Sequence, residues 1–162
     1  MRVERTVALG IVVACGIAGG GCGGVPPGPT STAVIQMTVN PATLTPAVCP
    51  PSHCGPLEGQ LEVTATLTIR ETAGVAGAVN RVGMVLRRQS DNASVAQTEQ
   101  SPGGRFAGLG SITVPIAMHY DRSAGEANMK VVLTIEARDD NGHTINSTME
   151  VQVLSSGLAI HY

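Results

Sequence analysis

The sequence predicts an all-β protein built as one antiparallel sandwich of about seven strands. Long stretches alternate apolar and polar residues with a period of two, which is typical of strands buried on one face only. An Asn-Gly pair joins the last two stretches, and this pair is the strongest short signal for a hairpin. The chain has 162 residues, which favours a single domain.

Each predicted strand is a stretch in which every second residue is apolar. In 61–70 the odd positions are apolar, and Glu, Thr and Arg fill the even ones. Seven or so strands separated by turns favour two packed sheets, with a closed barrel as the alternative architecture. In chain order the candidates are 33–39, 61–70, 82–88, 94–98, 112–118, 129–138 and 143–154.

The turn at 138–143 does not fit a calcium-binding loop. Aligning Asp139, Asn141 and Gly142 with an EF-hand puts Ala137 at its first position and Thr148 at its twelfth. Neither side chain suits those positions, so the spacing fails. We therefore predict a plain hairpin turn in which Asn and Gly tolerate positive φ.

The first 21 residues have the features of an export signal. Arg2 and Arg5 precede an uncharged apolar run over 7–18. About 12 apolar residues is signal-peptide length, whereas a membrane span needs roughly 20. The run ends in small residues, Ala18-Gly19-Gly20-Gly21, directly before Cys22.

This ending resembles the lipobox of bacterial lipoproteins, although Gly19 stands where that family most often has Leu. The resemblance implies that Cys22 is cleaved free as the first residue of the mature chain and carries the lipid. Cys15, with Val12 three residues before it, is the alternative, and an ordinary cleaved signal or an uncleaved anchor also stays open. Two or three acyl chains, such as palmitate, anchor stably. Because Gly23 rather than Asp follows Cys22, the family pattern favours the outer membrane.

The expected organisation has four parts. Residues 1–21 are the lipoprotein signal peptide, and 22–32 are a Gly/Pro-rich tether that reaches up to about 30 Å. Residues 33–155 form the sandwich domain, and 156–162 are a C-terminal tail.

The remaining cysteines, Cys49 and Cys54, form an even pair for an oxidising compartment. We predict a structural disulfide, which contributes roughly 2 kcal/mol when it closes so short a loop. A metal site is the weaker alternative, because only His53 joins the pair locally and a zinc site needs four ligands. Haem attachment and thioredoxin-like redox chemistry both need two residues between the cysteines, and here there are four.

Residues 32–155 as a whole resemble the immunoglobulin-like domains of bacterial surface lipoproteins. The likeness lies in the number and spacing of the strands. The Trp and the inter-sheet cysteine pair of antibody domains are absent, so the resemblance implies a fold and no particular activity.

Composition excludes several functions. The formal charge is −2, or about −3 after the signal, with no basic cluster, so no nucleic-acid partner is expected. The chain has no Trp, and Phe106, Tyr120 and Tyr162 are its only aromatics, too few for stacking platforms. There is no Gly-x-Ser-x-Gly elbow, and no carboxylate pair stands out for glycosidase chemistry, since Asp139-Asp140 lies in the predicted turn. The polar run 119–121 (His-Tyr-Asp) is the one strand end with mixed titratable groups.

We therefore expect an exported envelope lipoprotein, held to the membrane through Cys22, that acts as a structural or protein-binding module without catalysis, cofactor or metal. Its partner would be another envelope protein. A polysaccharide- or calcium-binding module is the alternative, and a small hydrolase or redox enzyme is a third hypothesis. Binding residues would lie in long loops, for which the candidates are 71–80, 99–109 and 119–128.

Overall fold

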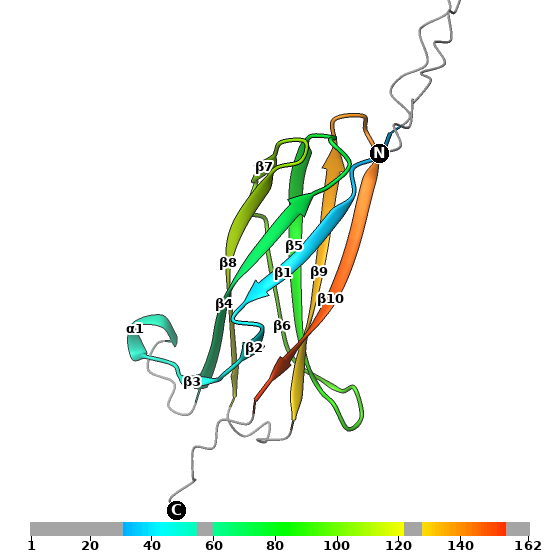
Figure 1. The fold of residues 1–162 in the computed structure, drawn as a ribbon. Coiled ribbons are helices and arrows are strands. Elements are labelled where there is room, and N and C mark those ends of the chain that lie inside the picture. The colour runs from blue at the N-terminus through cyan, green and yellow to red at the C-terminus, as the bar shows by residue number, and fades with distance from the viewer. Residues whose placement is uncertain (1–30, 55–59, 122–127, 155–162) are drawn as a thin grey trace, which may run out of the picture.

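The computed structural model describes residues 31–54, 60–121 and 128–154, which form two packed β-sheets (Figure 1). The predicted all-β sandwich is thereby confirmed. Seven strands have six residues or more, as expected, and three short ones have two. The strands are β1 (Ile35–Asn40), β2 (Thr43–Leu44), β3 (Ala47–Val48), β4 (Gln60–Glu71), β5 (Gly77–Arg88), β6 (Ser94–Gln100), β7 (Arg105–Phe106), β8 (Ser111–Asp121), β9 (Met129–Asp139) and β10 (Thr144–Val153).

The two sheets have an immunoglobulin-like arrangement. In the first sheet β4 pairs with β1, β8 and the short β3, all antiparallel. In the second sheet the order is β2-β10-β9-β5-β6, and β7 also pairs with β5. Only the two-residue pairing of β2 with β10 is parallel among the described strands. The first, second and fifth long strands thus face a sheet made of the other four, which is the sandwich that the resemblance implied.

The core lies between the sheets and is mostly aliphatic. Alternate residues of each long strand point inward, as the period-two pattern predicts. Phe106 and Tyr120, the aromatics among the described residues, are both buried. The most buried aliphatic side chains are Leu67, Ile69, Val79, Val82, Leu86, Val131, Leu133 and Ala137.

The predicted loop 71–80 was partly wrong. Strand β4 continues to Glu71, and β5 already begins at Gly77. Glycine is disfavoured in strands, which made this segment read as a loop. Here it allows a close approach, because a Cβ at position 77 would lie 2.5 Å from the carbonyl oxygen of Arg138 in β9.

The other two predicted loops also contain strand. Residues 119–121 are the end of β8, and 122–127 lie outside the described residues. The segment 99–109 contains the end of β6 and all of β7. The expected signal peptide, Cys22, most of the tether and the tail likewise lie outside the described residues.

The sandwich has two distinct ends (Figure 1). We call the end where β1 begins the upper end, and the end with β3 and the four-residue helix α1 (Pro51–Cys54) the lower end. Strand β4 runs from the lower end to the upper end, so its 12 residues separate the two by about 40 Å. Among the described residues no helix is long and apolar enough to cross a membrane.

Candidate functional site

A buried carboxylate, Glu71, closes the upper end of β4. Its side chain has no exposed surface, and both carboxylate oxygens accept hydrogen bonds from backbone amides. Five amides donate at 2.7–3.2 Å, those of Val34, Ala73, Gly74, Val75 and Leu109. Such donors favour the charged form of a carboxylate.

These amides decide the charge state of Glu71. Burial alone raises the pKa of this carboxyl, but the backbone hydrogen bonds, led by that from Leu109, outweigh burial and lower the pKa to about 2. Glu71 is therefore ionised at any pH near neutrality. A carboxylate so fully engaged is a structural anion and not a proton donor for catalysis.

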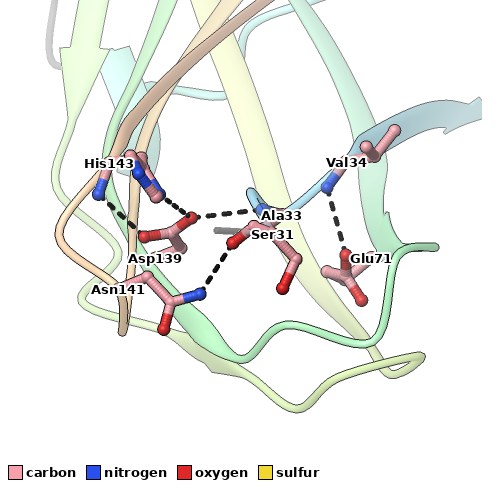
Figure 2. Close-up of polar contacts among 7 residues, drawn as sticks. All are labelled: Ser31, Ala33, Val34, Glu71, Asp139, Asn141 and His143. Carbon is pink, nitrogen blue, oxygen red and sulfur yellow. Dashed lines mark hydrogen bonds and ion pairs between the residues drawn. The ribbon is translucent and has the colours of Figure 1, made fainter. Parts of the chain in front are cut away.

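A second buried carboxylate, Asp139, ends β9 in the other sheet (Figure 2). It accepts hydrogen bonds from the amide of Ala33 at 3.1 Å and from the amide of His143 at 2.8 Å. The ring Nδ1 of His143 also lies 3.0 Å from its carboxylate. Burial raises the pKa of Asp139, but these hydrogen bonds hold it below its usual value.

Glu71 and Asp139 together hold the start of the described chain. Ala33 and Val34 are adjacent residues, and each amide donates to a carboxylate from a different sheet (Figure 2). The side-chain amide of Asn141 adds a third contact, donating to the carbonyl oxygen of Ser31 at 2.7 Å. We call Glu71 and Asp139 the N-terminal clamp, because they fix where the chain enters the domain.

The sequence contained a signal for the clamp that we missed. Glu71 continues the odd-numbered apolar series of β4, and Asp139 continues the odd-numbered series of β9. An acid that falls in phase with the buried face is either out of the strand or buried with partners. We had placed both residues in connecting loops.

At the lower end a disulfide joins Cys49 and Cys54, as predicted, with the two Cα atoms 6.0 Å apart. The amide of Cys49 donates to the carbonyl oxygen of Gln60, which ties the loop to the start of β4. The amide of Cys54 donates to Pro50 across the turn of α1. His53 lies in α1, but its side chain is outside the described part of the structure.

His119, not His53, is the histidine that the structure brings to this disulfide. The sulfur atoms of Cys49 and Cys54 and a ring nitrogen of His119 all lie within 4.8 Å of one another. His119 faces Glu62 across β4 and β8, and its Nε2 lies 2.9 Å from the Glu62 carboxylate. We call Cys49, Cys54, His119 and Glu62 the lower-end cluster.

The other predicted polar sites do not gather into a site. Tyr120 is buried, whereas His119 and Asp121, on either side of it in β8, are exposed, so the side chains of the run 119–121 lie on opposite faces of the strand. In the hairpin, Asp140 pairs with Arg105 at 2.8 Å, and Asp139 already accepts three hydrogen bonds. The hairpin is confirmed, with Thr144 paired to Arg138.

A shallow groove of about 530 Å³ lies beside β8, where 100–104 passes 112–115. Its lining is more apolar than polar, with Pro102, Ile112 and Pro115 among its residues. It carries no titratable side chain, so it offers contact surface rather than chemistry.

No family model matches this chain, and no curated protein matches it. Among the solved structures that share its fold are the following two. Structural genomics target SoR45 is 10% identical with a TM-score of 0.56, covering 79% of this chain and 92% of its own. The putative ApaA protein from Bordetella pertussis is 12% identical with a TM-score of 0.56, and the match covers 80% of this chain and 99% of that protein's chain. At these identities the similarity shows the fold alone.

Proposed function

We propose that this protein is an envelope lipoprotein, anchored through a lipid on Cys22, whose sandwich acts as a structural or protein-binding module without catalysis. The N-terminal clamp is the observation that carries the proposal. It fixes Ala33 and Val34 at the upper end, directly after the Gly/Pro-rich segment 22–32. A chain tethered by that segment presents its lower end away from the membrane.

The charged groups of the described residues support a non-catalytic role. Glu71 and Asp139 are committed to backbone amides, and His143 is committed to Asp139. A catalytic base needs a free lone pair within reach of a substrate proton. These three groups therefore support a structural function better than a hydrolytic one.

The glycan and calcium alternatives have less support. Phe106 and Tyr120 are buried, so among the described residues no aromatic ring offers a sugar a stacking surface. The acids of the hairpin, Asp139 and Asp140, are engaged by protein donors rather than turned toward a shared vacant site. A protein surface remains the best-supported partner.

Lipidation is tested by expressing the full chain in a double-membraned bacterium with a clickable palmitate analogue. Cys22→Ala should lose the label and release the protein from the membrane fraction. Cys15→Ala is the matched control and should keep both. Mass spectrometry of the mature N-terminus should find acylated Cys22, and an unmodified Cys22 in a membrane-independent protein contradicts the proposal.

The partner is tested by photo-crosslinking in intact cells. A photoreactive residue at exposed Ser52, at the lower end, should capture the same envelope protein in repeated experiments. The same probe at exposed Ala107, at the upper end, should not capture it. Failure of both positions to give a reproducible crosslink counts against a protein-binding role.

A further inference from the structure

We propose that the lower-end cluster is a redox-gated binding site for a thiophilic metal ion, Zn²⁺ or Cu⁺. Cys49, Cys54 and one ring nitrogen of His119 supply the ligands once the disulfide is reduced. Glu62 holds the His119 ring in position. Thiolate and imidazole are the ligands that these ions prefer.

The atoms already lie close to metal-binding distances. The two sulfurs and the His119 nitrogen are all within 4.8 Å of one another. Around a tetrahedral ion with Zn–S near 2.3 Å and Zn–N near 2.0–2.1 Å, ligand atoms lie about 3.5–3.8 Å apart. The nitrogen must move by at most about 1.3 Å to reach these separations, and the sulfurs separate when their bond breaks.

The fold supplies both a rigid and an adjustable half of the site. His119 and Glu62 are directly paired residues of β8 and β4, two long strands with continuous pairing. The amide of Cys49 is hydrogen-bonded to Gln60 at the start of β4, and Cys54 is the last residue of α1. The sheet therefore fixes the imidazole, while the short loop lets the two sulfurs adjust.

Glu62 is placed as the outer partner of a metal-binding histidine. Its carboxylate lies 2.9 Å from Nε2 of His119, and only 13% of the Glu62 side chain is exposed. When Nε2 donates its proton to that carboxylate, Nδ1 is left with the lone pair for the ion. Carboxylates in this position set the tautomer and the orientation of ligating histidines.

Reduction is the step that opens the site. A protein dithiol, or two molecules of a small thiol, transfers two electrons and two protons to the disulfide, so the S–S bond breaks, Cys49 and Cys54 become thiols, and the donor sulfurs are joined as a disulfide. The ion then displaces both thiol protons and binds two thiolates and a ring nitrogen of His119. The fourth position is open to water or another ligand. In the oxidised protein the sulfurs are bonded to each other and offer no thiolate.

The experiment uses the full mature protein in detergent, oxidised or reduced with a phosphine that is then removed. Zn²⁺ and Cu⁺ are each titrated anaerobically against a chromophoric chelator for that ion, and native mass spectrometry counts ions per chain. The reduced protein should bind one ion of at least one of the two metals, and the oxidised protein should bind none. The metal that binds identifies the site's preference.

Variants separate this site from adventitious binding. His119→Gln should lower the affinity at least tenfold, and Glu62→Gln, which leaves the three ligands intact, by about 10–100-fold. His143→Gln, a histidine change at the opposite end, should leave the affinity unchanged. Cobalt substitution should show thiolate-to-metal charge transfer in the reduced protein only.

Four outcomes would overturn the proposal. They are equal binding by oxidised and reduced protein, no binding of either ion by reduced protein, an affinity indifferent to His119→Gln, and loss of the β-sheet circular dichroism on reduction. The last counts because the sandwich must persist to hold His119 beside the thiols. None of these results bears on acylation of Cys22, so the two proposals fail separately.

Discussion

Single residues at the upper end show how this fold tolerates buried charge. The negative charges of Glu71 and Asp139 are stabilised mainly by hydrogen bonds from backbone amides rather than by cations. Leu109 illustrates the cost, since it adopts φ 60° although it is an exposed residue with no core contact to hold it there. That conformation costs a non-glycine residue about 1 kcal/mol, and it directs the Leu109 amide at Glu71. The strained backbone of Leu109 thus contributes one of the hydrogen bonds that stabilise the buried Glu71 carboxylate.

Glu71→Gln should destabilise the protein by at least about 2 kcal/mol, because an amide leaves buried N–H donors facing an NH₂ group. The ordinary pKa of this carboxyl is 4.5, and folding lowers it to about 2. Its stabilisation is therefore complete above pH 4.5 and is lost as the pH falls toward 2. Urea unfolding across this range should show a shallower pH dependence in the variant.

The matched control for that change is Glu99→Gln, which alters a solvent-exposed glutamate. Its free energy of unfolding should stay within about 0.5 kcal/mol of the parent value. If both variants behave alike, Glu71 does not contribute through buried hydrogen bonds.

Asp139→Asn should loosen the start of the chain. The Ala33 amide donates to this carboxylate, so its hydrogen exchange should accelerate in the variant. Asp140→Asn changes the adjacent, exposed acid, which pairs with Arg105, and should leave the Ala33 amide protected. Equal protection of Ala33 in both variants would show that Asp139 does not hold the entering chain.

At the scale of elements, regular alternation made the long strands predictable. The ends of four of them, including the terminal hairpin, lie within three residues of the predicted bounds. The first part of β5 was missed because Gly77 and its neighbours lack that pattern and are placed by the backbone of β9. Strands of two residues carry no period at all, and β2, β3 and β7 exist only through their partners.

Only the cysteine pair of the lower-end cluster could be predicted from the sequence. Cys49 and Cys54 are close in sequence, so their pairing followed from spacing and compartment. The approach of His119 depends on the register of β8 against β4, which no local pattern specifies. We therefore considered His53, the histidine nearest in sequence, as the metal ligand.

The hairpin turn gives a test at this scale. Gly142 has φ 91°, and a Cβ there would meet nothing nearer than 3.9 Å. Gly142→Ala should therefore cost about 1–2 kcal/mol through backbone conformation rather than through a clash. Gly142→Asn should cost less, because asparagine tolerates positive φ. The thermal unfolding midpoint should be highest for the parent protein, lower for Gly142→Asn and lowest for Gly142→Ala. A higher midpoint for Gly142→Ala than for Gly142→Asn would contradict this explanation.

At the scale of the whole molecule, the N-terminal clamp and the proposed metal site are separated by the length of β4. The clamp lies at the upper end and the core runs the whole length of the sandwich, whereas the disulfide closes only a short loop at the lower end, outside the buried cluster between the sheets. The cysteine pair is thus available for change without repacking the core. That separation is what a reducible site on a stable scaffold requires.

The double change Cys49→Ser with Cys54→Ser should leave the sandwich folded. We expect a loss of about 2 kcal/mol or less, because the closed loop is short. Denaturant unfolding should keep its cooperativity and slope, with only the midpoint shifted. Loss of the cooperative transition would show that the disulfide supports the core.

The placement of β1 has a mechanical consequence. A force pulling the chain away from the upper end, ahead of Ala33, acts along β1, whose residues are all paired with β4. Antiparallel hydrogen bonds lie across the strand axis, so such a force shears them together instead of opening them one at a time. Asp139 and Glu71 bear the load first, at the two amides where the chain enters. A domain pulled through its first strand in this way resists extension, because the hydrogen bonds of that strand must break together rather than one after another.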